Sequence, residues 1–335
     1  MSRAIDPDTA AKLKSYNLKP VYEEVVQALS LPTEGLLEIE ILKEFHFPEG
    51  HNVLKDGHAI AVSKLGLVQA FLVAKSRLEW WRMERFLRSD DEMFDVTFVI
   101  LLFDPEHLTA ANTRKVIVQE QLETDKMDPR KILEREKRAV DSLLTSRLHR
   151  HTKSPVLWSH RRWVISQYAT YHLPVDVLGD IKSAVCVAGE RHPRNYYAWC
   201  HARFLVNNDT INNNIDRGKL LEVVETWCAL NHTDISGWSF LSFLLDFNKD
   251  VPEAQAQNSG VIANVLGRVD ALRLSNESVW VFLRTLAGAG AMTDEAYAWF
   301  REIQKGLLET ETTPAEGKAV LRKAVEWCET YRGRN

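Results

Sequence analysis

The sequence has no apolar run long enough to cross a lipid bilayer. Its longest runs are LGLVQAFLVA at 65–74 and VTFVILLF at 96–103, whereas a membrane-spanning helix needs about 20 apolar residues. The first residues, MSRAIDPDTAAKLKSYN, lack the apolar segment of a secretory signal, and the last, YRGRN, carry no lipidation motif. These absences predict a cytoplasmic protein with no transmembrane segment.

Motifs for several common chemistries are also missing. There is no glycine-rich phosphate loop, no His-Glu zinc motif and no nucleophile elbow. His46, His51 and His58 lie close together in sequence, but at spacings unlike those of a zinc site. The formal net charge of −4 does not indicate nucleic-acid binding, and the charged run KILEREKRAVD at 131–141 is interpreted as a solvated helix face with internal ion pairs. We therefore expect neither a metal in this chain nor a nucleic-acid partner.

Cysteine is scarce, whereas tryptophan is abundant. None of the four cysteines forms a C-x-x-C pair, and all lie in helix-like segments. This pattern predicts free, buried thiols in a reducing compartment. The ten tryptophans are the first indication that a specific segment repeats.

Apolar residues recur at three- and four-residue spacing along most of the chain, which predicts helices nearly throughout. In the clearest case, 129–148, Asp128 is placed to cap a helix that begins at Pro129. The polar stretch 207–218 predicts a loop. No stretch shows convincing strand alternation, and the best strand candidate, 96–103, fits a buried helix equally well. Further helices are predicted at about 176–190, 219–230 and 252–269, and from Thr313-Pro314 onward.

Similar segments recur at a period near forty residues. In each, a tryptophan precedes an apolar helical turn, and successive tryptophans are 41, 39 and 42 residues apart. A degenerate further copy is HLTAANTRKVIV at 107–118, where Ala111 replaces the tryptophan and Arg114 keeps a basic position three residues later. The four clear copies are SPVLWSHRRWVI at 154–165, NYYAWCHARFLV at 195–206, DISGWSFLSFLL at 234–245 and NESVWVFLRTLA at 276–287, headed by Trp158, Trp199, Trp238 and Trp280.

A fixed period of this length is typical of stacked supersecondary units. Each unit is predicted to contain a helix, a short turn and a second helix with the tryptophan in its first turn. Because one hairpin cannot bury its own apolar face, neighbouring hairpins must stack. We expect the indole rings to be core residues between adjacent helices, each stabilising the fold by about 1.5–3 kcal/mol through burial.

Arginines follow the repeat tryptophans at helical spacing. Arg161 and Arg162 come three and four residues after Trp158, and Arg203 and Arg284 come four residues after their own tryptophans. Side chains at this spacing share a helix face with the ring. They are expected to stack on an aromatic ring or to pair with an acid on the next helix, and a structural role is favoured for them.

The pattern Asn-Tyr-x-x-Trp-x-x-Arg in an array of helical hairpins resembles the repeat of protein prenyltransferase alpha subunits. The resemblance covers roughly 100–290, with NYYAWCHARFLV and NESVWVFLRTLA as the closest copies. Within the family, HLTAANTRK and KSPVLWSHRRWV resemble the group of prenyltransferase alpha-subunit repeat-containing proteins. The chain departs from the pattern at Ala202, Leu241 and Leu283, which stand where arginine is usual.

The resemblance implies an all-α fold, an α–α superhelix built as a right-handed solenoid of helical hairpins. It also implies a heterodimer in which this alpha subunit wraps around a beta subunit that carries the zinc, so no cofactor is expected in this chain. The implied reaction joins a prenyl group from a prenyl diphosphate to a cysteine of a target protein. Geranylgeranyl transfer with a Rab-type beta subunit is favoured, and the chain alone is expected to be inactive.

The resemblance also points to site residues. A lysine five residues before a repeat tryptophan contacts the diphosphate in the family, and Lys153 holds that position here. Arg194 is its counterpart in the next repeat, and Tyr196 and Tyr197 match aromatic positions that face the active site. The alternatives are a solvated surface lysine for Lys153 and packing between hairpins for Tyr196. Pro155 replaces a usual tyrosine, so the geometry of the lysine turn is open.

Three regions are predicted: an N-terminal helical region at 1–95, the repeats at 96–290 and capping helices at 291–335. In EWWRMERF, at 79–86, the two adjacent tryptophans point to different helix faces, one in the core and one on a contact surface. The alternative function is a non-enzymatic helical-repeat scaffold or adaptor, because the HEAT period overlaps this one. The tryptophan at the head of each second helix distinguishes the two possibilities, since HEAT repeats do not require it.

Overall fold

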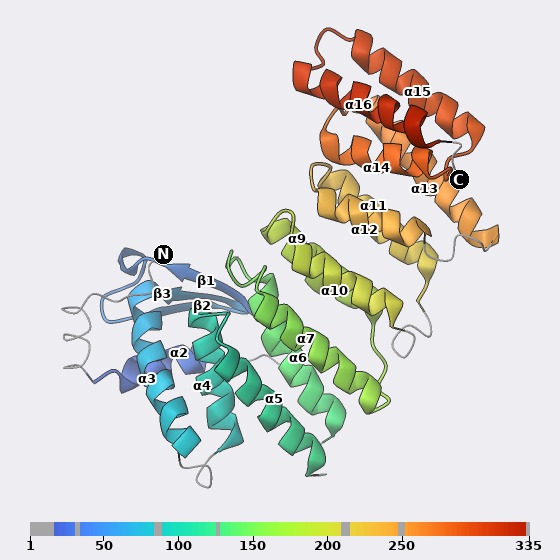
Figure 1. The fold of residues 1–335 in the computed structure, drawn as a ribbon. Helices are drawn as coiled ribbons and strands as arrows, with labels where there is room; N and C mark the ends of the chain where they lie inside the picture. Colours follow the sequence, from blue (N-terminus) through green and yellow to red (C-terminus); the bar gives the residue numbers. More distant parts are fainter. Residues whose placement is uncertain are drawn as a thin grey trace. The chain divides into compact units, whose positions relative to one another are not determined.

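The computed structural model describes residues 17–30, 34–83, 89–124, 128–208, 215–246 and 252–332. Helices account for most of these residues, and the exception is a small sheet (Figure 1). The chain divides into two compact units, Met1–Val175 (unit 1) and Asp176–Asn335 (unit 2). Stacked helical hairpins occur in both, which confirms the predicted all-α array. The boundaries predicted at residues 95 and 290 stay predictions.

Unit 1 combines the sheet with stacked helices. The helix α4 forms a hairpin with α5, α6 forms one with α7, and α5 also contacts α7. In chain order its elements are α2 (Lys19–Ala28), β1 (Glu38–Leu42), η1 (Glu44–His46), β2 (Val53–Asp56), β3 (Ala59–Ser63), α3 (Lys64–Met83), α4 (Asp90–Phe103), α5 (Leu108–Glu123), α6 (Pro129–Thr145) and α7 (Pro155–Thr170).

Capping side chains mark where the helices of unit 1 begin. Ser89 caps α4, Asp128 caps α6 and Ser154 caps α7, each by accepting a hydrogen bond from a backbone N–H two or three residues later. Such caps satisfy N–H groups that a helix start leaves unpaired. The predicted start at Pro129 is confirmed, and the ambiguous run 96–103 is the buried helix α4.

The prediction that the chain has no strands is wrong for residues 38–63. There β1 pairs with β3 in parallel and β2 pairs with β3 antiparallel, in the order β1-β3-β2. The strands are four or five residues long, so their alternation is too brief to stand out. A usable signal is Gly57, because a two-residue hairpin turn favours glycine at its first position. Gly57 adopts the required left-handed backbone, with φ of 56°.

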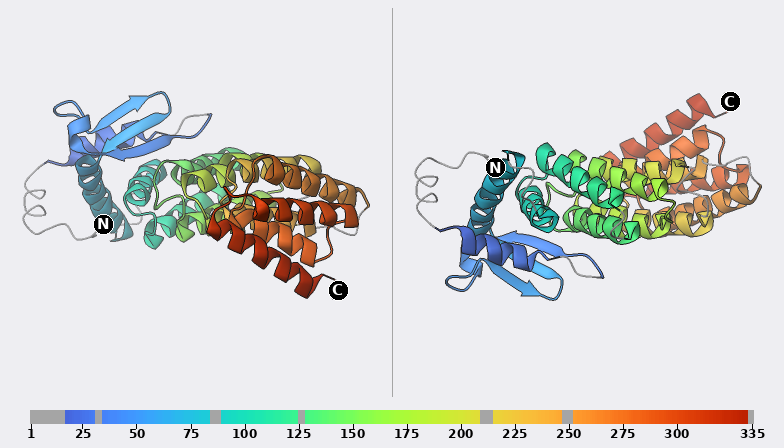
Figure 2. Two further views of the ribbon diagram at one scale, coloured as in Figure 1. Left: turned by 90° about the horizontal axis from the view of Figure 1, so that it is seen from above. Right: turned by 90° about the horizontal axis from the view of Figure 1, so that it is seen from below.

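The sheet packs against helices on one face and at one edge. Ile39 and Ile60 are buried, and Figure 2 shows the sheet beside the neighbouring helices α2 and α3. At the β1 edge, the end of α6 takes the place of a further strand. The backbone N–H of Leu37 donates to Ser142 Oγ at 3.0 Å, and that of Ile39 donates to Ser146 Oγ at 3.0 Å. These bonds protect an edge that would otherwise expose unpaired backbone groups.

Unit 2 is an array of helical hairpins in two layers. One layer contains α10, α12, α14 and α16, each in contact with the next, and the other contains α11, α13 and α15 (Figure 1). Its elements are α8 (Val177–Asp180), η3 (Ile181–Cys186), α9 (Val187–Arg191), α10 (Tyr196–Asn207), α11 (Arg217–Leu230), α12 (Ile235–Asp246), α13 (Pro252–Ala271), α14 (Glu277–Gly288), α15 (Asp294–Glu309) and α16 (Ala315–Tyr331).

The helices predicted in unit 2 are confirmed, with one change of winding. The helix predicted at 176–190 is continuous, but Ile181–Cys186 is wound as a π-helix. Close by, a Cβ added to Gly189 would lie 2.9 Å from the ring of Trp227, so glycine allows this close approach. The loop predicted at 207–218 overlaps the last residue of α10 and the first two residues of α11, and its residues 209–214 lie outside the described residues.

The adjacent tryptophans near the end of α3 point to different faces, as predicted. Trp81 is buried, with 4% of its surface exposed, whereas Trp80 is 48% exposed. Residues 84–86 of the quoted stretch lie outside the described part of the chain.

Candidate functional site

The second helix of each repeat begins with the same local arrangement. The residue four positions before the tryptophan lies at the helix start: Ser154, Asn195, Asp234 and Asn276. The first three accept hydrogen bonds from backbone N–H groups in the first turn. Asn276 instead donates to the carbonyl of His232 in the preceding repeat, at 2.8 Å. A fixed helix start determines where each tryptophan points.

The repeat tryptophans are core residues, as predicted, and all four are at most 3% exposed. In three of them the indole N–H donates to the carbonyl six residues earlier. Trp158 bonds Thr152 at 2.8 Å, and Trp280 bonds Leu274 at 2.8 Å. Trp238 bonds the matching carbonyl at 2.9 Å. The indole N–H of Trp199 is buried without a hydrogen-bond partner, so the turn before α10 differs from the others.

A buried charge network joins the two hairpins of unit 1. Arg114 donates to both carboxylate oxygens of Glu136, from Nε at 2.9 Å and from Nη2 at 2.8 Å. His160 Nε2 bonds the same carboxylate, and Arg114 Nη1 also donates to the carbonyl of Phe94 at 2.9 Å. Burial alone would raise the pKa of Glu136, but the Arg114 charge and the His160 hydrogen bond lower it to about 2.

A second buried pair lies further along α6. Arg161 is fully buried and donates from Nε to Asp141 Oδ1 at 2.6 Å. Lys137 Nζ donates to Asp141 Oδ2 at 2.8 Å. Burial favours a higher pKa for Asp141, but these two cations outweigh it and lower the pKa to about 2. Arg161 thus pairs with an acid on the preceding helix, whereas the prediction placed the acid on the next helix.

The interpretation of 131–141 as a solvated helix face is wrong at two positions. Glu136 is 0% exposed and Asp141 is 2% exposed, because α6 is covered by both α5 and α7. The repeat contains a signal that would have predicted the burial of these two acids. The basic residues Arg114 and Arg161 occupy equivalent places in successive repeats, and each requires an acid on the helix between them.

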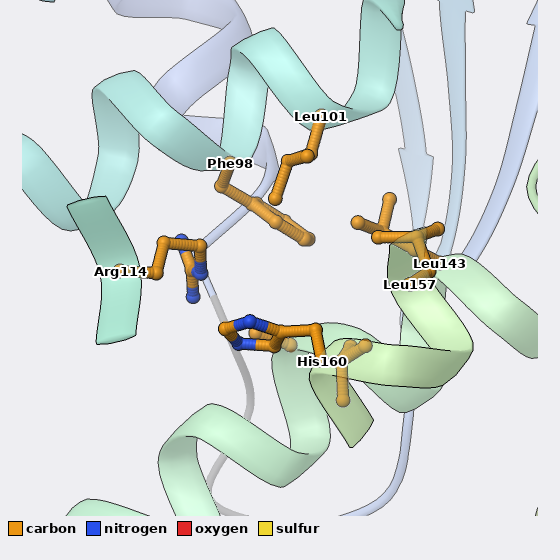
Figure 3. Close-up of a pocket in the computed structure, with 8 residues that line it drawn as sticks. Phe98, Leu101, Arg114, Leu143, Leu157 and His160 are labelled. Carbon is orange, nitrogen blue, oxygen red and sulfur yellow. The ribbon is translucent and has the colours of Figure 1, made fainter. Parts of the chain in front are cut away.

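The pocket beside this network has no room for a ligand. It is enclosed by α4, α5, α6 and α7 and admits no water-sized sphere. Figure 3 shows Arg114 and His160 at one side of it, facing Phe98 and Leu101. The pocket is a gap in the packing, and the charged residues beside it contribute to the stability of unit 1.

The remaining repeat arginines lie nearer the surface. Arg203 is half-buried and donates from Nη2 to the carbonyl of Ser239 at 3.0 Å, with its guanidinium 5.7 Å from the ring centre of Phe240. Arg284 lies 4.9 Å from the ring centre of Trp327. Both contacts reach the next helix of the same layer, which agrees with the stacking prediction. Arg162 is exposed.

Lys153 lies on the turn between α6 and α7, where its side chain is exposed. Neighbouring residues hold this turn firmly. The ring of His151 is 4% exposed, and its Nε2 lies 3.0 Å and 2.9 Å from the carbonyls of Leu101 and Leu102 at the end of α4. Ser154 Oγ donates to the carbonyl of Pro105 at 3.1 Å. The backbone that carries Lys153 is therefore preorganised by contacts with the preceding repeat.

Arg194, Tyr196 and Tyr197 lie at the turn before α10 in unit 2. Arg194 is exposed and has a left-handed backbone, with φ of 61°. Tyr196 is 68% exposed and Tyr197 is 40% exposed, and their rings meet edge to face with centroids 5.6 Å apart. The pKa of Tyr196 is raised by its hydrogen bond with Cys200. Plain packing of Tyr196 between hairpins does not fit this exposure.

Lys153 belongs to unit 1, whereas Arg194 and the tyrosines belong to unit 2. Their meeting at one diphosphate or subunit junction therefore stays a prediction. Within the described ranges, no three His, Cys, Asp or Glu side chains converge as a metal site, and no helix is both long and apolar enough to span a membrane.

All four cysteines are free thiols, as predicted, and three are buried while Cys200 is partly exposed. Burial raises the pKa of the Cys186 thiol to about 12 and raises that of Cys228 well above its ordinary value. Both thiols therefore stay protonated at neutral pH and are unreactive as nucleophiles.

Parts of this chain are similar to known proteins. A family model described as the ECM9 middle domain matches residues 157–266. The protein prenyltransferase alpha subunit repeat-containing protein 1-B of Xenopus laevis is 28% identical over 192 residues, which are 51% of this chain and 41% of that protein. The human repeat-containing protein 1 is 30% identical over 190 residues, 51% of this chain and 44% of that protein.

A geranylgeranyl transferase type-2 subunit alpha 2 of Arabidopsis thaliana is 25% identical over 166 residues, 46% of this chain and 23% of that protein. The matched region spans less than half of the length of each of these three relatives. Together with the tryptophan-headed hairpins, these matches confirm that the chain is related to the protein prenyltransferase alpha subunits and, among them, to the repeat-containing proteins.

Proposed function

We propose that this chain is the alpha subunit of a heterodimeric protein prenyltransferase. It transfers a geranylgeranyl group to a cysteine of a target protein, and it is active only with a beta subunit of the Rab type. The relationship to alpha-subunit repeat proteins supports the assignment, and the Arabidopsis relative is named as a geranylgeranyl transferase subunit. In this proposal the beta subunit carries the zinc, which lowers the pKa of the acceptor thiol.

The observation that carries the proposal is an apolar edge on unit 2, here called the turn edge. It follows three consecutive turns between the helices of a hairpin. Hydrogen bonds join the adjacent turns, from Arg194 N to Asp234 Oδ2 and from Asn276 Nδ2 to the carbonyl of His232. The exposed apolar residues of the turn edge are Tyr196 (68%), Tyr197 (40%), Leu230 (77%), Ile235 (36%) and Leu272 (63%).

Exposed aromatic and aliphatic side chains that gather on adjacent turns are characteristic of a surface that binds another protein. Isolated exposed apolar residues are common, but here they recur at equivalent turns of successive repeats. Three successive repeats of unit 2 could therefore contact one partner through the turn edge. A beta subunit that lies along this edge would cover all five residues.

Co-expression with a Rab-type beta subunit is expected to give a stable heterodimer that depends on the turn edge. Leu272→Asp places a charge in the edge and is expected to weaken the complex at least tenfold, since an unpaired charge in an interface costs several kcal/mol. The control is Leu65→Asp, which changes an exposed leucine (41%) in the first turn of α3, where an acid is compatible with the helix dipole. Dissociation constants of the heterodimer, measured by size-exclusion chromatography and calorimetry, compare the two variants. Equal weakening of the complex by both variants would contradict the proposal.

Lys153→Ala is expected to lower kcat in the assembled complex by about 100-fold, because a fixed cation at the leaving diphosphate stabilises charge that develops in the transition state. Heterodimer affinity should be unchanged, since Lys153 is exposed and is not one of the residues of the turn edge. Single-turnover transfer measures the effect, with Lys64→Ala as a matched exposed lysine. Equal turnover in the two variants would remove Lys153 from the diphosphate site. A stable complex with no transfer by the wild type would instead favour the scaffold function.

A further inference from the structure

Asp234 joins two neighbouring turns of unit 2 through its two carboxylate oxygens. Oδ1 accepts hydrogen bonds from the backbone N–H groups of Ser236 at 2.8 Å and Gly237 at 3.3 Å, which caps α12. Oδ2 accepts a hydrogen bond from the backbone N–H of Arg194 at 2.6 Å, in the turn before α10. The residue is 4% exposed, so water does not compete well for either oxygen.

The Arg194 turn needs this outside support more than its counterparts do. A left-handed conformation is unfavourable for a residue other than glycine and persists only where the surroundings impose it. In the other three repeats, the indole N–H of the tryptophan ties the turn to its own helix, as Trp280 does through the carbonyl of Leu274. Trp199 makes no such bond. Asn195 Nδ2 still ties the turn to the carbonyl of Ala188 at 3.3 Å, and the carboxylate of Asp234 supplies a restraint from the next repeat in place of the missing tryptophan bond.

We infer that Asp234 is a positioning residue, which holds Arg194 in its left-handed conformation and thereby directs the Tyr196–Tyr197 pair outward along the turn edge. The chain leaves the Arg194 turn directly into α10, where the two tyrosines are the first two residues. Their edge-to-face contact and exposure therefore depend on how this turn enters the helix. The part of the inference that names the beta subunit as the partner rests on the proposed function.

Substitutions of Asp234 can separate its two roles, which are capping α12 and holding the Arg194 turn. Asparagine and serine are good caps, so Asp234→Asn and Asp234→Ser retain the bond to the first turn of α12. Neither side chain offers a second carboxylate oxygen to the Arg194 N–H. Asp216 is the matched control, because it caps α11 through Lys219 N at 3.0 Å and, among the residues that the structure describes, forms no hydrogen bond to another repeat. Asp216→Asn and Asp216→Ser therefore test the same chemical change without the link between turns.

Hydrogen exchange on the full chain tests the positioning directly. The Arg194 amide is expected to exchange at least tenfold faster in both Asp234 variants, because it loses its acceptor, and at the wild-type rate in both Asp216 variants. Exchange in the middle of α12 should remain at the wild-type rate, which shows that the helix is intact. An Arg194 amide equally protected in wild type and Asp234→Asn would overturn the inference.

Affinity for the beta subunit tests whether the position of the Arg194 turn contributes to binding of that subunit. Both Asp234 variants are expected to bind it about tenfold more weakly than the wild type, whereas the Asp216 variants bind as the wild type does. Faster Arg194 exchange with unchanged affinity would overturn the role of Asp234 in directing the tyrosines. If the wild-type chain itself does not bind the beta subunit, the proposed function fails. The exchange of Arg194 still decides whether Asp234 holds the turn.

Discussion

Glu136→Ala is expected to lower the free energy of unfolding of unit 1 by about 3–5 kcal/mol, the cost of leaving a buried charge without its partner. Arg114 is 1% exposed and would lose both hydrogen bonds to this carboxylate. His160 would lose the acid that it bonds in the same step. Since α4, α5, α6 and α7 all pack around the network, both hairpins should loosen together.

The matched control is Glu134→Ala, which removes a carboxylate from the same helix. Glu134 is 42% exposed and lies 3.9 Å from Arg138 in a surface pair, so its loss should cost less than about 1 kcal/mol. Urea unfolding of the full chain, followed by circular dichroism, gives both values. A cost below about 1 kcal/mol for Glu136→Ala would mean that Arg114 reaches water or another acid, contrary to the packing described.

Acidification is expected to destabilise unit 1 in two steps. Burial lowers the pKa of His151 to about 4, so the unfolded chain takes up this proton first as the pH falls from about 6.5 to 4. That step should remove about 3 kcal/mol. Glu136 and Asp141 have pKa values of about 2, so their stabilisation is complete above their ordinary pKa values near 4 and disappears as the pH approaches 2.

The first step is assigned to His151 by substitution. His151→Gln retains an N–H donor for the carbonyls of Leu101 and Leu102 but cannot titrate. It is expected to remove about 3 kcal/mol of the loss of stability between pH 6.5 and 4, and His160, whose pKa burial also lowers, accounts for any remainder. His46→Gln, at an exposed histidine of η1, should leave the loss intact. Thermal unfolding at closely spaced pH values measures both. An undiminished slope in His151→Gln would assign the proton uptake elsewhere.

Much of the helical array was predictable because its determinants are local. Ser154 caps α7 three residues ahead of the N–H that it binds, and Pro129 occupies the first position of α6. The recurring tryptophan marks the second helix of each repeat, because a ring in the first turn of that helix is well placed to fill the space between adjacent hairpins. These signals need only a few neighbouring residues or a fixed period, and both can be read along the chain.

Burial of the charged residues of α6 could not be predicted in this way. The spacing within 131–141 is equally compatible with ion pairs on a solvated face. Glu136 is buried because α5 and α7 bring Arg114 and His160 to it, from positions 22 and 24 residues away. The small sheet was missed for a related reason, since the N–H of Leu37 is paired by Ser142, 105 residues later.

By itself, the sequence determined the repeat, the starts of the helices and the core position of the tryptophans, because capping and helical periodicity act over a few residues. Only the tertiary structure decided which charges are buried and how the edge of the small sheet is protected. It also decided that Asp234 accepts a hydrogen bond from the backbone N–H of Arg194, 40 residues earlier. Each of these features depends on two segments that are far apart in the sequence and become neighbours only when the chain folds. The residues around either segment therefore do not reveal the contact.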